Sequence, residues 1–434
     1  MMKVVKFGGS SVANATQYKK VKAIITSDDE RRIIVVSAPG KDEVNSSKIT
    51  DLLFLLHAHL EYGIDYQYIL TTIYERYDVL VKELSLSDRF KQSFESFKNE
   101  LKKGISKDYL VSRGEYFSAL IASEYLECSF VDAIDVIAVK YDGTIDYEKT
   151  RKNLNAILQQ HTRVVIPGYY ASTPNNQVRL FGRGGSDLTG SILVRVSNAD
   201  LYENWTDVSG IYVADPRIID NPKRISSITF GELRELSYRG ARVLQQESVI
   251  PLEDLNIPIQ IKNTNDPSAR GTLIWNDVEP NGDIITGISG LRAFTSITIT
   301  KDSDKQVTAV LRDVFNLFIR YRISVEHIPT GIDTFSIITK TDGLKNVYFD
   351  FMSDLRMIDG VISVEEEDSI SLLAIVGRNM AYIPGVAGRI FNVLGQHKIN
   401  IKVIAQASKE ISIIIGVSNE DYEAAVKTLY SEFY

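Results

Sequence analysis

The chain has 434 residues, a net charge of −7 and a hydrophobic content of 44%, values typical of an ordinary soluble globular protein rather than a disordered one. The acidic balance argues weakly against nucleic acid as a partner, and the single cysteine, Cys128, excludes an intrachain disulfide and a cysteine-based metal cluster. The first residues enter a strand-like run rather than a signal peptide, and no apolar stretch reaches the roughly 20 residues of a membrane span. We therefore expect a cytoplasmic protein without a membrane partner.

The first part of the chain alternates strand-like and helix-like segments. Helical patterns cover 11–27, 49 to about 104, and 108–127, whereas 3–7, 31–36 and 131–139 are strand-like. Further β-branched runs that meet turn residues lie within 163–172, 198–217 and 257–264. This alternation predicts an α/β domain with a largely parallel sheet, whose ligands gather at the carboxyl ends of the strands.

An internal repeat follows residue 285. Residues 313–328 match residues 389–404, and Phe315 with Phe391 and Ser336 with Ser412 are each separated by 76 positions. Each copy is predicted to contain a strand, a helix and two further strands. In the first copy the three strands are "TSITIT", "ISVEHI" and "TFSIIT". We expect two copies of a small α+β module, and a duplicated module beside an α/β domain fits regulation better than catalysis.

The opening stretch "KFGGSS" has the outline of a phosphate-binding turn. Gly8 and Gly9 would let a phosphate approach backbone N–H groups, and the following helix points its positive end to the same place. Because a helix dipole contributes only ~0.3–2 kcal/mol, a full charge is also needed, and Lys6 is the candidate. An ordinary tight turn is the alternative.

Three other segments carry candidate chemistry. In "FGRGGSDLTG", Arg183 suits bidentate capture of a carboxylate and Asp187 suits orienting a phosphate-bound lysine or Mg²⁺, although a hairpin turn would look similar. In "SRGEYF", Glu115 lies near the start of an apolar helix, where helix capping is the alternative. "WTDVSGIYVADPR" could hold a purine or be a well-capped loop.

Together, "KFGGSSV", "VVSAPG", "SRGE", "GRGGSD" and "WTDVSGIYVADPR", in this order and followed by two small modules, resemble the aspartokinases over essentially the whole chain. The resemblance implies an amino-acid-kinase-type three-layer α/β sandwich with a mainly parallel sheet, followed by two ACT-type (ferredoxin-like α+β) domains. The implied boundaries are 1–285 for the kinase domain, 291–365 for the first ACT domain and 366–434 for the second. Alternatively, the C-terminal end returns to complete the first ACT domain.

The same resemblance implies ATP- and Mg²⁺-dependent phosphorylation of the L-aspartate side-chain carboxylate to 4-phospho-L-aspartate. This is the first step toward lysine, threonine and methionine. Lys6 would contact the transferring phosphate and Asp187 would hold that lysine; no protein metal ligand is implied. The substrate side would comprise Ser37, Thr50, Glu115, Arg183, Gly184, Gly185 and Ser186. The nucleotide side would comprise Lys6, Gly8, Gly9, Ser10, Thr206, Asp207, Tyr212, Arg217 and Arg242.

One segment departs from the family pattern. Where members usually have "GAKVLHP", this chain has "GARVLQQES", so Arg242 replaces a lysine that reaches ATP phosphates, and Gln245 and Gln246 follow it. Arginine keeps the charge but is larger and forked. We expect activity to survive with altered nucleotide affinity.

The first ACT module would bind an inhibitory amino acid. Effectors in the family are usually lysine and sometimes threonine or another pathway product. The residues implied here are Glu326 for an ammonium group and Thr330, Gly331, Ile332 and Asp333 for the effector backbone. Pairing of ACT units across chains implies a homodimer or a dimer of dimers.

Two alternative functions stay open from the sequence. The chain could phosphorylate another acid, such as glutamate or acetylglutamate. It could also be a catalytically impaired amino-acid sensor, in which Arg242 and the missing histidine mark lost activity.

Overall fold

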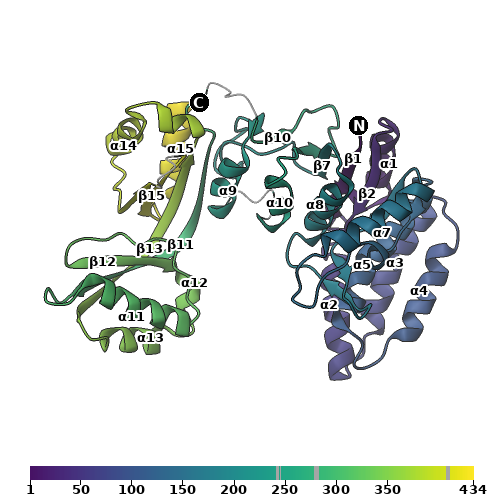
Figure 1. Cartoon of the computed structure of the whole chain (residues 1–434), viewed down its shortest axis with the longest axis horizontal. Helices are drawn as coiled ribbons and strands as arrows, with labels where there is room; N and C mark the ends of the chain where they lie inside the picture. Colours follow the sequence, from purple (N-terminus) through teal and green to yellow (C-terminus); the bar gives the residue numbers. More distant parts are fainter. Residues whose placement is uncertain (241–243, 245, 278–282, 407–410) are drawn as a thin grey trace. The chain divides into compact units, whose positions relative to one another are not determined.

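The computed structural model describes residues 1–240, 244, 246–277, 283–406 and 411–434 (Figure 1). The chain forms two compact units. The first contains Met1–Ile211, Ser226–Phe230 and Arg242–Val278, and the second contains Tyr212–Ile225, Gly231–Ala241 and Glu279–Tyr434.

An eight-stranded sheet, in the order β3-β4-β2-β1-β7-β9-β10-β8, forms the centre of the first unit. Neighbouring strands are parallel except for β10, which runs antiparallel to β9. The strands are β1 (Lys3–Phe7), β2 (Arg31–Val36), β3 (Ser129–Phe130), β4 (Val164–Pro167), β7 (Leu201–Thr206), β8 (Ser227–Ile228), β9 (Ile259–Asn263) and β10 (Thr272–Ile274). A separate hairpin joins β5 (Tyr170–Ser172) to β6 (Val178–Leu180).

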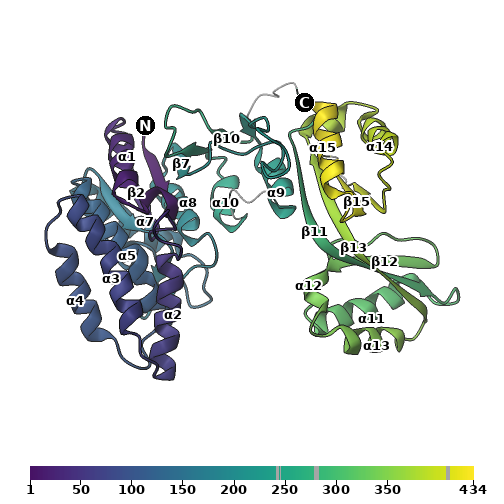
Figure 2. The same cartoon turned by 180° about the vertical axis from the view of Figure 1, so that it is seen from behind.

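Helices cover both faces of this sheet, which gives three layers (Figure 2). On one face lie η1 (Gly9–Val12), α1 (Ala15–Thr26), α2 (Ile49–Tyr62), α3 (Gln67–Glu83), α4 (Arg89–Glu100) and α5 (Lys107–Tyr125). The other layer contains α7 (Tyr147–Gln160), α8 (Gly185–Ser197) and α10 (Gln246–Glu253), and the short α6 (Ala133–Val136) packs on α7 and β5. Because side chains alternate along a strand, Val5 and Phe7 of β1 enter the α1–α5 core, whereas Lys6 faces α8.

The second unit contains a five-stranded antiparallel sheet in the order β12-β11-β13-β15-β14. Its strands are β11 (Gly287–Lys301), β12 (Thr334–Lys340), β13 (Val361–Val376), β14 (Val403–Gln406) and β15 (Ser412–Ser418). Its helices are α9 (Phe230–Tyr238), α11 (Val307–Arg320), α12 (Thr341–Leu344), α13 (Tyr348–Arg356), η2 (Arg378–Tyr382), α14 (Val386–Gln396) and α15 (Tyr422–Phe433).

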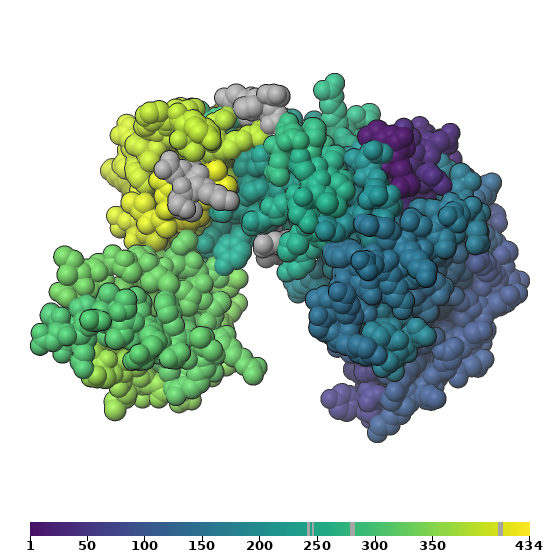
Figure 3. All heavy atoms as spheres, in the orientation of Figure 1, coloured from purple at the N-terminus to yellow at the C-terminus, as the bar shows by residue number. Residues whose placement is uncertain are grey.

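The repeat seen in the sequence is present as two modules that share the long strands β11 and β13. Helices α11 and α14 end at equivalent repeat positions, Arg320 and Gln396. Two separate cores form: α11 and α13 pack on the β11 half that contains Ile297, and α14 and α15 pack on the half that contains Ile288. In Figure 3 these halves are the green and the yellow lobes of this unit.

The fold class expected from the sequence is confirmed, but two predicted strands are wrong. Residues 133–136 of the predicted strand 131–139 form α6, because the Asp132 side chain caps a helical turn by accepting a bond from the N–H of Ile134. The predicted strand "ISVEHI" reduces to a single bridge between His327 and Ile338, and the side chains of Glu326 and His327 bond to Arg239 instead.

Candidate active site

Strand β1 ends in the glycine turn that the sequence singled out. The N–H of Gly8 donates to the carbonyl of Trp205 in β7 at 3.0 Å. A Cβ on Gly9 would lie 2.8 Å from the carbonyl oxygen of Ala38, so only glycine fits where the turn crosses the segment after β2. The turn is therefore held between two neighbouring strand ends, with η1 and α1 following it.

Lys6 and Asp187 meet although 180 residues separate them in the sequence. Lys6 Nζ lies 2.6 Å from Asp187 Oδ1 in α8, and Lys6 is only 7% exposed. Asn204, which pairs with Lys6 in the sheet, donates its Nδ2 to the same oxygen at 2.8 Å. A Cβ on Gly8 would lie 3.5 Å from Lys6 Nζ, so this buried cation is fixed beside the glycine turn.

The second glycine-rich loop forms the start of α8. Gly184 caps this helix with a φ of +72°, a left-handed conformation that favours glycine. A Cβ on Gly185 would lie 2.5 Å from the ring of Tyr169, which itself has a φ of +80°. Such backbone strain is commonly stored at functional sites. Arg183 is exposed, and its guanidinium has no hydrogen-bond or ion-pair partner in the described part of the chain.

Glu115 is a buried carboxylate on α5. It is 4% exposed, and its Oε2 has no hydrogen-bond partner among the described residues. Burial raises its pKa to about 8, although a hydrogen bond from the backbone of Ala38 acts in the opposite direction. A buried polar atom without a partner is costly, which makes this oxygen a place for a cationic ligand.

Ser37 and Thr50 bracket the segment between β2 and α2. Ser37 follows β2, and its N–H donates to the carbonyl of Phe7 at 3.1 Å; Thr50 is the second residue of α2. Ser37 therefore directly precedes Ala38, which contacts Gly9 and Glu115, whereas Thr50 lies at the other end of this segment.

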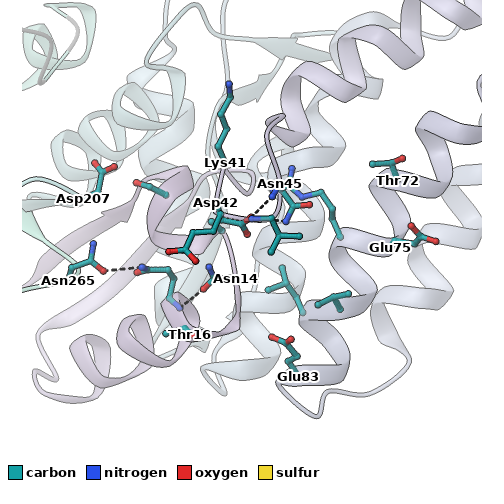
Figure 4. Close-up of a pocket in the computed structure, with 18 residues that line it drawn as sticks. Asn14, Thr16, Lys41, Asp42, Asn45, Thr72, Glu75, Glu83, Asp207 and Asn265 are labelled. Carbon is teal, nitrogen blue, oxygen red and sulfur yellow. Dashed lines mark hydrogen bonds between the residues drawn. The ribbon is translucent and has the colours of Figure 1, made fainter.

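A cavity of about 830 Å³ opens on the α1 side of the glycine turn (Figure 4). Ser10 and Asp207 line it, and the hydroxyl of Thr206 donates to Asp207 at 3.0 Å. In Figure 4, Lys41, Asp42 and Asn45 form one wall beside α3, and Asn14 and Thr16 of the α1 segment form another.

The other residues that the sequence assigns to nucleotide binding lie in the second unit or outside the described residues. Tyr212 and Arg217 belong to the second unit, where Arg217 is exposed and forms an ion pair with Asp215 at 2.5 Å. Arg242 and Gln245 lie outside the described residues, and Gln246 begins α10.

The residues assigned to an effector lie after α11. The side chain of Glu326 is only 4% exposed, and Arg239, which follows α9, donates to its Oε2 at 3.1 Å and to Nε2 of His327 at 2.6 Å. Burial, with the Arg239 charge, lowers the pKa of His327 to about 4. Thr330, Gly331, Ile332 and Asp333 form the turn into β12, in which Asp333 pairs with Lys301 at 3.1 Å.

Comparisons with known proteins place this geometry in a family. The sequence profile of the amino acid kinase family matches residues 1–263, and that of an ACT domain matches residues 373–433. Aspartokinase 3 of Bacillus subtilis is 32% identical, over the whole of this chain and 99% of the relative. The chain belongs to the amino acid kinase family, and within it to the aspartokinases.

Solved structures agree with this placement. The structure superposes on that of Clostridium acetobutylicum aspartate kinase with a TM-score of 0.92, at 42% identity and full coverage of both chains. E. coli aspartokinase III, at 27% identity and coverage of 100% of this chain and 99% of that one, gives TM-scores of 0.80 in complex with aspartate and ADP and 0.78 in complex with lysine and aspartate.

Sequence reasoning missed two functional candidates in this kinase. Asn204 bonds to Asp187, and its signal was a polar residue inside the buried strand "YENW". Arg239 bonds to Glu326 across 87 positions, and no local pattern marks it. No described helix is long and apolar enough to cross a membrane.

Proposed function

We propose that this enzyme transfers the γ-phosphoryl group of ATP to the side-chain carboxylate of L-aspartate, giving ADP and 4-phospho-L-aspartate. The observation that carries the proposal is the buried Lys6–Asp187 pair beside the glycine turn. The unpartnered oxygen of Glu115, which connects to the same turn through Ala38, supports an amino-acid site next to it. The complex of E. coli aspartokinase III with aspartate and ADP adds further support.

The reaction needs positioning and charge neutralisation rather than a general base, because the aspartate carboxylate is already ionised. A carboxylate oxygen forms the new bond to phosphorus while the bond to the bridging oxygen breaks, and the electron pair leaves with ADP. Lys6 neutralises charge on the moving phosphoryl group, and Asp187 with Asn204 holds that lysine in place.

Mg²⁺ fits the donors present. The bonds from Lys6 and Asn204 both go to Oδ1 of Asp187, so the second carboxylate oxygen of Asp187 would be available to the ion. When bound with ATP, the ion would neutralise phosphate charge. Gly8, Gly9 and Ser10 hold the phosphates, and Thr206 and Asp207 lie on the nucleotide side; for Tyr212, Arg217 and Arg242 the nucleotide role stays a prediction from the sequence.

The substrate is recognised at its two ends. Glu115 binds the ammonium group of aspartate, and Arg183 binds the α-carboxylate by a bidentate contact. Ser37 and Thr50 assist, together with the backbone of Gly184, Gly185 and Ser186. Arg183 is exposed and without a partner among the described residues, which suits it for a ligand that arrives from solution.

The test is a hydroxamate assay with ATP, Mg²⁺ and a panel of acids. The proposal predicts acyl-phosphate product with L-aspartate, and much less with glutamate or acetylglutamate. Product with one of those acids alone would reassign the substrate. Nucleotide binding in a calorimetric titration without any turnover would instead favour the catalytically impaired sensor.

Regulation is the second part of the proposal. Residues 1–285 catalyse, and the ACT modules, assigned to 291–365 and 366–434, bind an amino acid made from aspartate, with lysine as first candidate and threonine as the second. An ammonium group at Glu326 would have to compete with the guanidinium of Arg239 and with the ammonium group of Lys340, which both pair with this carboxylate. The E. coli enzyme solved with lysine supports this choice. A thermal-shift screen and the mass in solution test the effector and the expected homodimer or dimer of dimers.

A further inference from the structure

Arg76 of helix α3 contacts the segment between β2 and α2. Nη2 of Arg76 donates to the carbonyl of Gly40 at 2.6 Å, and its Nη1 donates to the carbonyl of Ser47 at 2.6 Å. These carbonyls stand near the two ends of residues 40–47, so one guanidinium spans the whole loop. None of the motifs quoted from the sequence includes α3.

Gly40 in turn contacts the phosphate turn. The N–H of Gly40 donates to the carbonyl of Gly9 at 2.9 Å. A Cβ on Gly40 would lie 2.8 Å from the carbonyl carbon of Gly9 and 3.0 Å from the N–H nitrogen of Ser10, so the two backbones touch without room for a side chain. A displacement of Gly40 must therefore move the Gly9 peptide.

The guanidinium of Arg76 bonds to the carbonyls of this loop, and the Asp42 carboxylate of the same loop acts on its charge from beyond ion-pair distance. Among the described residues, no carboxylate lies within ion-pair distance of its guanidinium, and Figure 4 shows the loop residues Asp42 and Asn45 between α3 and the α1 segment. Charge-assisted bonds to carbonyls are stronger than neutral ones, and a guanidinium fork fits two acceptors at once. The next residue, Tyr77, donates to the carbonyl of Gly114 at 2.6 Å, so this turn of α3 also holds the helix of Glu115.

We infer that Arg76 is a positioning residue for phosphoryl transfer, because it fixes the Gly40 peptide and through it the Gly9 peptide of the phosphate turn. The inference rests on the proposed placing of the ATP phosphates at Gly8 and Gly9. Misplacement of reacting groups by about 1 Å can cost ~100-fold in rate. Arg76→Ala is therefore expected to lower kcat by ~10- to ~100-fold.

The experiment must separate positioning from a contribution to folding alone. Arg76→Ala, Arg76→Lys and the control Lys82→Ala are compared by kcat, by KM for ATP and for aspartate, and by melting temperature. Lys82 is an exposed cation on the same helix that pairs with Asp78. Methylguanidinium is then added to each variant, at a concentration that leaves the wild-type melting temperature unchanged.

We expect a lower kcat and a higher KM for ATP in Arg76→Ala, partial loss in Arg76→Lys, and no change in Lys82→Ala. Methylguanidinium should restore activity to Arg76→Ala only, since it can occupy the vacated position between the two carbonyls. A lower melting temperature with unchanged kinetics of the folded enzyme, or a loss of rate that methylguanidinium does not rescue, overturns the inference. If Lys6→Ala also keeps its rate, the proposed site has failed rather than the role of Arg76.

Discussion

Replacing Glu115 by glutamine tests the substrate site most sharply. The change keeps shape and removes the charge that would meet the aspartate ammonium group in a buried position. A hydrogen bond to a charged group contributes about 1.5–3 kcal/mol, so the KM for aspartate should rise roughly 10- to 150-fold. The KM for ATP should change little, because the side chain lies on the amino-acid side.

The pH dependence gives a second, independent readout. With a pKa of about 8, about a tenth of the Glu115 carboxyl is ionised at pH 7 and about three quarters at pH 8.5. If the ionised form binds the ammonium group, the KM for aspartate should fall about eightfold over this interval. The phenols of Tyr77 and Tyr169, which interact with Glu115, have pKa values raised above 10, so they do not titrate in this window.

The same carboxyl also affects stability, and the sign follows from its raised pKa. The protonated group favours the folded state, and this contribution is lost as pH rises from 4.5 toward about 8. The melting temperature of Glu115→Gln should therefore fall less than that of the wild type as pH rises from 4.5 to about 8.

Initial rates over a matrix of aspartate and pH, for wild type, Glu115→Gln and the control Glu124→Gln on the same helix, measure these effects. An unchanged KM in Glu115→Gln, or a flat KM in the wild type from pH 7 to 8.5, would refute the assignment.

Three further outcomes are expected. Asn204→Leu removes a bond to Asp187 and should lower kcat with little change in KM; a higher KM with unchanged kcat would show that Asn204 supports binding instead. Arg239→Gln removes one of the two cations, Arg239 and Lys340, that pair with Glu326. Less of the inhibitory amino acid should then be needed for half-inhibition, and an unchanged inhibition curve would contradict the proposed exchange. Because burial lowers the pKa of His327 from 6.5 to about 4, the folded state loses stability as pH falls through that range. His327→Gln should flatten the decline in melting temperature between pH 6.5 and 4, and an unchanged slope would remove His327 as its cause.

The layers of the fold were predictable because the signals are local. Strand β1 is a buried apolar run followed by two glycines, and the repeat around Phe315 and Phe391 marks two modules directly. The helix at Ala133–Val136 was missed because it lies in a short, mostly apolar and β-branched run that is typical of a buried strand, and only the Asp132 cap distinguishes it. Here the helix cap by Asp132 outweighs the strand propensity of the segment.

The site residues were predictable from the sequence only where they belong to a recognisable motif. The contact between Lys6 and Asp187 was expected from the sequence and is present at 2.6 Å. Arg76, Asn204 and Arg239 act through contacts that only the folded chain creates, with backbone carbonyls or with side chains on distant elements. Local periodicity holds no information on such pairs.

The most direct test of the account is the rate of Lys6→Ala with saturating ATP, Mg²⁺ and aspartate, beside Lys3→Ala at the other end of the same strand. Lys3 pairs with Asp28 and Glu30 and has no proposed role in catalysis. Loss of one preorganised transition-state donor costs ~10²- to 10³-fold in kcat, so Lys6→Ala should lose at least ~100-fold while Lys3→Ala stays near the wild type. A Lys6→Ala enzyme that folds and turns over at a near-normal rate would contradict the proposed mechanism.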